Sequence, residues 1–158
     1  MRMLILQCLL SINSRAYSGT SIVVHSFPFY IQNAVTSLQA KGVTPIVSSQ
    51  TPDNIWDSTN TTITAPPRFV GYAQTSAQRT GAAYVNHFGY VAQAYQKLGV
   101  KAVTAFYPND HTHTSPAGAN VVAEAFVRGV ICGGSALKAK VNSKGQAVPS
   151  ECLPAMVA

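Results

Sequence analysis

Residues 43–50, Val43-Thr44-Pro45-Ile46-Val47-Ser48-Ser49-Gln50, form a short apolar run that predicts a buried β-strand, with Pro45 as an irregularity near its start. A second short strand is predicted for Ala82-Ala83-Tyr84-Val85-Asn86. Strands that alternate with helical patterns indicate crossover units and a parallel sheet, so the predicted fold class is α/β. The helical patterns run from Phe27 to Lys41, from Arg68 to Thr80, from His87 to Leu98, and onward from Ser115-Pro116.

Helix ends are marked by ordinary start and stop signals. Ser26 precedes Phe27-Pro28 as a cap followed by an early proline, and Gly42 follows the first helix. Gly81 and Gly99 follow the next two. Two or three strands make a small sheet, so the chain reads as part of a layered α/β domain.

Composition excludes several classes of protein. A chain of 158 residues is about one domain long, and 10% charged residues argue against a disordered or coiled-coil chain. No apolar run reaches the roughly 18 residues that a transmembrane helix needs, which argues against a membrane protein. The net charge is +6, but the basic residues are scattered, and the cluster Lys138, Lys140 and Lys144 has no aromatic residues between its members. This pattern does not predict a nucleic-acid partner.

The three cysteines indicate the redox compartment. Cys132 and Cys152 bracket a loop rich in Gly, Ser and Lys, which a disulfide would restrain, whereas Cys8 is left over. The alternative of a metal or redox pair lacks C-x-x-C spacing. A disulfide implies an oxidising compartment.

The first ten residues, Met1 to Leu10, have a basic start and a short apolar run. Two interpretations stay open: the core of a signal peptide, or a displaced start that is not a true leader. We therefore divide the chain into an N-terminal segment, 1–25, and an α/β domain, 26–158, that ends in a disulfide-closed tail.

The densest group of polar residues is Asp110-His111-Thr112-His113-Thr114-Ser115-Pro116-Ala117-Gly118. An aspartate three residues before a histidine can accept the imidazole Nδ1–H, which leaves Nε2 free as a general base. Two alternatives compete with this acid–base pair. Asp110, His111 and His113 could form a metal site, although no further ligand is evident. Asp110 and Thr114 could be turn or cap residues, with the histidines solvated.

A family resemblance is carried by this same run, which continues through Ala119 and Val121-Val122-Ala123-Glu124-Ala125-Phe126. It resembles the last block of rhamnogalacturonan acetylesterases, which are secreted SGNH (GDSL-type) hydrolases with a flavodoxin-like three-layer α/β/α fold. Ser48-Ser49-Gln50-Thr51-Pro52-Asp53-Asn54 with Trp56, and Pro67-Arg68-Phe69-Val70, are similar to neighbouring segments of that family. The resemblance runs from about Phe27 to Leu153.

The resemblance implies roles for particular residues. Asp110 and His113 match the Asp and His of the catalytic triad, His111 matches a non-catalytic position, and Cys132 and Cys152 match a C-terminal disulfide. The implied substrate is an acetylated pectic polysaccharide, the implied localisation is extracellular, and no cofactor or metal is implied. Asn60, in the sequon Asn60-Thr61-Thr62, is a predicted glycosylation site of a secreted chain, and Trp56 and Tyr72 are candidates for stacking on sugars or, for Trp56, for packing.

The chain departs from the family at the nucleophile. It contains no Gly-Asp-Ser and no Gly-x-Asn-Asp block, and its nearest candidates are Ser18 and Gly19-Thr20-Ser21. Ser48 and Ser49 are expected to end a strand and Ser115 to cap a helix. The sequence therefore predicts an ester hydrolase of which the Asp and His are present and the nucleophile is unknown; the alternative is an inactive fragment or a polysaccharide-binding remnant. A complete domain would be a monomer, whereas an incomplete sheet is expected to aggregate or dimerise.

Overall fold

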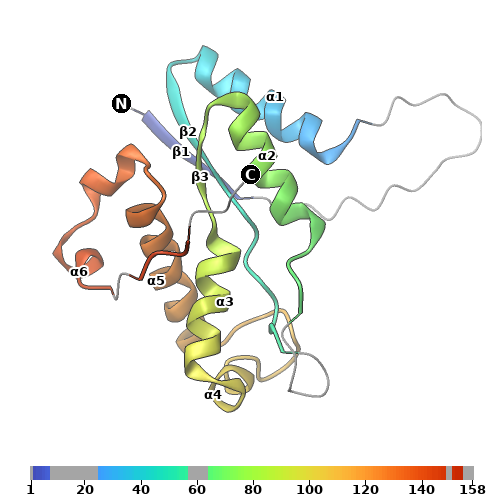
Figure 1. Cartoon of the computed structure of the whole chain (residues 1–158), viewed down its shortest axis with the longest axis vertical. Coiled ribbons are helices and arrows are strands. Elements are labelled where there is room, and N and C mark those ends of the chain that lie inside the picture. Colours follow the sequence, from blue (N-terminus) through green and yellow to red (C-terminus); the bar gives the residue numbers. More distant parts are fainter. Residues whose placement is uncertain (1, 8–24, 57–63, 149–150, 155–158) are drawn as a thin grey trace, which may run out of the picture.

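The computed structural model describes residues 2–7, 25–56, 64–148 and 151–154. Three strands and six α-helices form the described part, with one short 3₁₀ helix in the tail (Figure 1). The strands are β1 (Arg2–Gln7), β2 (Val43–Ser48) and β3 (Ala83–Val85). The helices are α1 (Phe27–Ala40), α2 (Arg68–Thr80), α3 (His87–Leu98), α4 (Val100–Ala105), α5 (Pro116–Cys132), η1 (Ala136–Lys140) and α6 (Ser143–Gln146).

The three strands make one parallel sheet in the order β1-β2-β3. β1 pairs with β2 from Arg2 opposite Val43 to Gln7 opposite Ser48, and β3 joins from Ile46 opposite Ala83 onward. The predicted α/β class with a small parallel sheet is confirmed. β1 lies in the segment for which the sequence left a leader or a displaced start open, and here its backbone forms an edge strand of the sheet.

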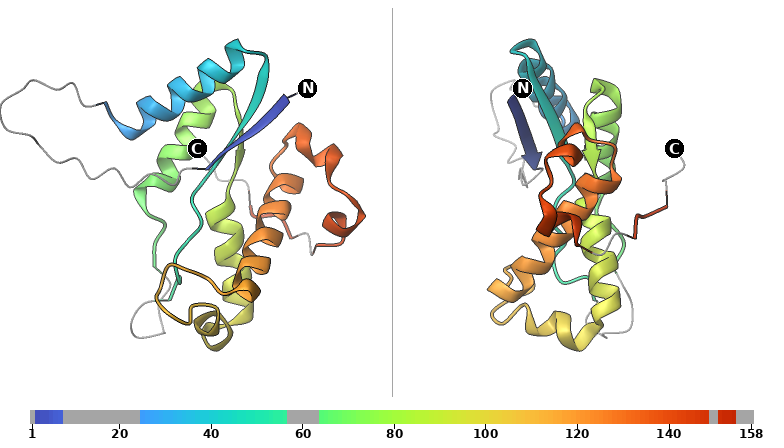
Figure 2. Two further views of the ribbon diagram at one scale, coloured as in Figure 1. Left: turned by 180° about the vertical axis from the view of Figure 1, so that it is seen from behind. Right: turned by 90° about the vertical axis from the view of Figure 1, so that its left-hand side faces the viewer.

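Helices α1 and α2 lie on one face of this sheet, and α5 lies on the other face beside β3 (Figure 2). Side chains alternate between the faces along a strand. Val47 accordingly packs with Val35 of α1 and Ala73 of α2, whereas its neighbour Ile46 packs on the opposite face with Val130 of α5. The result is a layered arrangement in which α1 and α2 oppose α5.

A second core lies beyond the ends of the strands, between α3, α4 and α5. Tyr95 and Tyr107 are buried at its centre, and their hydroxyl oxygens lie 3.1 Å apart. Burial raises the pKa of both phenols. Trp56 packs against this core, as expected of a packing residue. The other buried members of the core are Ile55, Tyr90, Val91, Val103 and Ala125.

The C-terminal tail is attached to α5 by a disulfide. Cys132, the last residue of α5, is bonded to Cys152, and their Cα atoms lie 5.6 Å apart. The sequence predicted this pairing but indicated only a loop rich in Gly, Ser and Lys between the two cysteines. In the structure it contains η1 and α6, where Ser135 and Asn142 cap the helix starts.

The bounds of α2 and α3 agree with the sequence prediction, and α4 was not predicted. The two predicted strands are shorter in the structure than in the prediction. Asn60, Cys8, Ser18 and Ser21 lie outside the described residues. In the part of the chain that the structure describes, no helix combines the length and hydrophobicity needed to span a bilayer.

Candidate active site

The loop between α4 and α5 is shaped by its own polar groups. One carboxylate oxygen of Asp110, Oδ1, accepts the backbone N–H groups of Thr112 and His113, each at 2.7 Å. This is the local side-chain-to-backbone turn that aspartate favours. Asn54 donates its backbone N–H to the His111 carbonyl at 2.8 Å, which ties the loop to the segment after β2.

The second carboxylate oxygen of Asp110 reaches the imidazole of His113. Oδ2 lies 2.8 Å from His113 Nδ1, so Nδ1 carries the proton and donates a hydrogen bond to the carboxylate. The His113 amide, the His113 imidazole and the Thr112 amide together lower the pKa of Asp110 to about 2. The hydrogen bond and the charge of Asp110 in turn raise the pKa of His113. Nε2 is then the ring nitrogen without a proton, which can act as a base.

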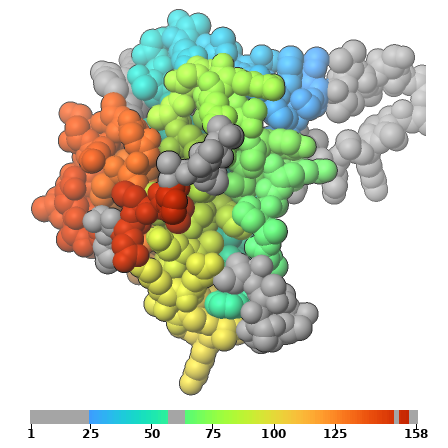
Figure 3. Space-filling view, viewed as in Figure 1, coloured from blue at the N-terminus to red at the C-terminus, as the bar shows by residue number. Residues whose placement is uncertain are grey.

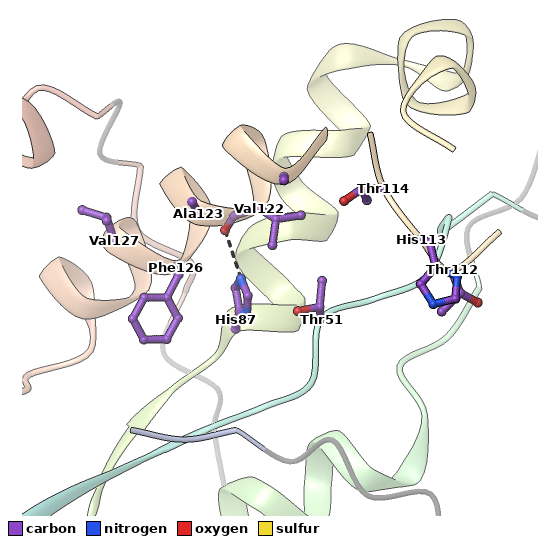
Figure 4. Close-up of a pocket in the computed structure, with 10 residues that line it drawn as sticks. Thr51, His87, Thr112, His113, Thr114, Val122, Ala123, Phe126 and Val127 are labelled. Carbon is purple, nitrogen blue, oxygen red and sulfur yellow. Dashed lines mark hydrogen bonds between the residues drawn. The ribbon is translucent and has the colours of Figure 1, made fainter. Parts of the chain in front are cut away.

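His113 lines a pocket of about 780 Å³ (Figure 4). Thr51 follows β2, and His87 follows β3 after one residue, so the pocket lies at the edge where these parallel strands end. Such an edge is where open α/β sheets bind ligands. The stretch of α5 from Ala119 to Val127 forms an apolar wall. The lining residues are Thr51, His87, Thr112, His113, Thr114, Ala119, Val122, Ala123, Phe126 and Val127.

A second histidine of the pocket was missed by the sequence analysis. His87 is only 4% exposed, and its Nε2 donates to the Val122 carbonyl at 3.0 Å (Figure 4). Its Nδ1 has no hydrogen-bond partner among the described residues, and burial lowers the pKa of the ring. Its place directly after a predicted strand was a usable signal, because polar residues at the carboxyl ends of parallel strands face the ligand edge.

The described serines near this edge have structural contacts. Ser49 is buried and its Oγ accepts the Phe88 backbone N–H at 2.9 Å, while Ser48 Oγ donates to the Ser49 carbonyl. Ser115 caps α5 through the Gly118 N–H. Among the residues that the structure describes, no three His, Cys, Asp or Glu side chains gather as a metal site.

Comparison with known proteins places this geometry in context. Over 121 residues, or 77% of its length, the chain is 49% identical to a rhamnogalacturonan acetylesterase of Emericella nidulans. The chain is a relative of rhamnogalacturonan acetylesterase. No family model matches it. It spans about half (49%) of the length of that fungal relative, and the resemblance indicated by the sequence is confirmed.

The Asp110–His113 pair lies inside the similar region. A continuous segment of 121 residues in a chain of 158 cannot avoid residues 38–121, which contain β2, β3, the loop and the start of α5. Elements that build the pocket are therefore part of what is shared with the acetylesterase.

Proposed function

We propose that this chain carries the acid–base part of an acetylesterase site, acting on acetyl groups of a pectic polysaccharide of the rhamnogalacturonan type. The observation that carries the proposal is the 2.8 Å hydrogen bond between Asp110 Oδ2 and His113 Nδ1 at the wall of the pocket. The similarity to the fungal acetylesterase supports the reaction class, ester hydrolysis. The SGNH three-layer arrangement, with its site at the ends of the strands, is the fold that we infer for the complete domain.

The proposed mechanism assigns each group one task. His113 Nε2 accepts the proton of a serine hydroxyl while the serine oxygen attacks the acetyl carbonyl carbon. Asp110 holds the ring in the Nδ1–H tautomer and stabilises the imidazolium that forms. His113 then returns the proton to the departing sugar oxygen. Water, activated by the same nitrogen, hydrolyses the acyl-serine and releases acetate.

The nucleophile is the open position of this mechanism. The sequence contains no Gly-Asp-Ser and no Gly-x-Asn-Asp block, and Ser49 and Ser115 are occupied in structural contacts. Triad members act as a unit, so a base without a nucleophile accelerates little. We therefore expect this chain by itself to hydrolyse little or no ester. The second candidate function is that of an inactive protein that binds polysaccharide.

Two experiments test the proposal. A fluorophosphonate probe should leave the purified chain unlabelled; labelling that His113→Ala abolishes would show that a serine completes the site in this chain. Acetate release from acetylated rhamnogalacturonan is measured in the same preparation.

The second experiment provides a nucleophile from the fungal relative. This chain replaces the similar segment of the Emericella nidulans acetylesterase, and the chimera should release acetate. His113→Ala should then lower kcat by about 10⁴-fold or more, in line with the loss of a triad base. His111→Ala is the matched control two residues away and should keep most activity. A folded chimera in which His113→Ala and His111→Ala have equal effects would contradict the assigned roles.

A further inference from the structure

Six aromatic rings gather on the first turns of α1 and α2 and just before α1, and we call them the aromatic surface. His25 stacks on Phe29 with ring centroids 3.7 Å apart, and Phe29 meets Tyr30 edge-on at 5.7 Å. A second group of rings joins the two helices: the ring of Phe27 on α1 lies 5.0 to 6.4 Å from those of Phe69 and Tyr72 on α2. Its members are His25, Phe27, Phe29, Tyr30, Phe69 and Tyr72.

This surface is where the described part of the chain exposes its large apolar side chains. Phe29, Tyr30 and Tyr72 are 39%, 47% and 38% exposed, and the remaining large exposed hydrophobic residue, Leu98, lies at the end of α3. The two helices lie side by side on one flank of the molecule (Figure 3). Single exposed apolar residues need no explanation, whereas several exposed aromatic residues on two neighbouring helices are typical of a binding surface.

Together, the two helices of the aromatic surface carry positive but no negative side chains. Neither α1 nor α2 contains an aspartate or glutamate, in a chain that has five acidic residues in all. The exposed Arg68 guanidinium lies over the Phe69 ring, 5.3 Å from its centroid. An occupant of this surface therefore meets aromatic faces beside a positive charge, which suits an anionic ligand with flat apolar faces.

The topology places this surface at the same edge of the sheet as the pocket. α1 leads directly into the start of β2, and α2 leads into the start of β3, so each helix runs back along the sheet and begins near the ends of the strands. The segment that joins β2 to α2 carries Thr51 of the pocket and Asn54, which bonds to the loop of His111. The pocket, which has α5 as its wall, and the aromatic surface, which lies on α1 and α2, are therefore both directed toward this edge of the sheet.

We propose that the aromatic surface binds a uronate-containing polysaccharide. The C–H face of a sugar ring packs on the electron-rich face of Tyr30 or Tyr72, and Arg68 pairs with a uronate carboxylate. The choice of sugar polymer rests on the proposed function, because a pectic substrate consists of such rings and charges. The aromatic surface would hold the polysaccharide while an acetyl group of the same polysaccharide molecule occupies the pocket.

Measurements of polysaccharide binding, which do not depend on ester hydrolysis, test this proposal. We expect the purified chain to bind polygalacturonate in calorimetry or affinity electrophoresis, and Tyr30→Ala with Tyr72→Ala to weaken binding about tenfold, as the loss of two stacking contacts implies. Arg68→Gln should flatten the dependence of affinity on salt. Leu98→Ala is the matched control, since it removes an exposed apolar side chain away from the surface. Thermal unfolding establishes that each variant is folded, and Phe29→Ala serves as a second variant.

The outcomes separate this proposal from the esterase proposal. Polymer binding that depends on the tyrosines supports the surface whether or not the chain or its chimera hydrolyses esters. The proposal is overturned if the wild-type chain does not bind polygalacturonate, or if the double variant binds as tightly as Leu98→Ala. It is also overturned if a neutral polymer binds with equal affinity and equal salt dependence.

Discussion

Two sides of one pocket hold histidines in opposite environments. The His113 side chain is 81% exposed and is paired with Asp110 on a loop, whereas His87 is 4% exposed at the start of α3. The carboxylate raises the pKa of His113, and burial lowers the pKa of His87. An exposed histidine paired with a carboxylate thus lies in the same pocket as a buried histidine whose neutral form is favoured and which holds the wall in place.

This difference shows that position in the pocket does not determine the task of a histidine. His87 donates to the Val122 carbonyl and meets Phe126 edge-on at 5.3 Å, so it joins α3 to α5. His113 has contacts mainly with its own loop. The predictions below separate the supporting side from the side that we propose for chemistry.

The largest expected effect is on folding, from the supporting side. His87→Ala removes a buried ring and its hydrogen bond, so the free energy of unfolding should fall by about 3 kcal/mol. His113→Ala removes an exposed ring and should leave the free energy of unfolding nearly unchanged. Urea denaturation of the two variants measures this. Equal decreases in the free energy of unfolding for His87→Ala and His113→Ala would contradict the supporting role of His87.

The next effect concerns how closely the loop packs on α5. A Cβ added at Gly118 would lie 2.8 Å from Phe106 Cβ and 3.0 Å from Thr114 Cβ, so Gly118→Ala should destabilise the protein by about 2 kcal/mol. Gly71→Ala in α2 is the control, because that Cβ meets nothing within 4 Å and alanine favours a helix by about 1 kcal/mol. Thermal unfolding compares the two. A neutral Gly118→Ala would mean that the loop is free to shift.

The third effect is the pH dependence of stability. The pKa of His87 is lowered by folding, so the unfolded chain binds its proton more readily, and stability should fall as the pH drops below about 6.5, by at most about 1.4 kcal/mol per pH unit. The His113 contribution has the opposite sign and is lost as the pH rises through its raised pKa, but exposure keeps it small. Urea denaturation between pH 5.5 and 7.5 should show that the free energy of unfolding of the wild type falls toward low pH, and that it falls less in His87→Phe.

The smallest effect is a shift in titration on the loop. By NMR the pKa of His113 should lie above the ordinary histidine value of about 6.5, and Asp110→Asn should return it toward that value. The substituted side chain keeps an amide oxygen as acceptor but loses the negative charge. If the pKa of His113 does not change in Asp110→Asn, the Asp110 carboxylate is not what raises it.

Much of the scaffold could be predicted from local pattern. The 3.6-residue period and glycine stops defined α2 and α3, and the apolar runs defined β2 and β3, because these elements bury one face and end where the chain must turn. α4 was missed because it begins directly after Gly99, a residue that marks the end of the preceding helix. The tail helices were missed because polar, glycine-containing sequence carries no apolar period.

The sequence by itself determined the Asp110–His113 pair, since three residues of separation let the carboxylate curl back onto both the backbone and the ring. It also determined which cysteines could close the tail. Only the tertiary structure decided that His87 shares the pocket with His113, and that rings from α1 and α2 form one surface. These contacts join residues far apart in the chain, and they arise because parallel strands bring their ends, and the helices that begin there, to a single edge.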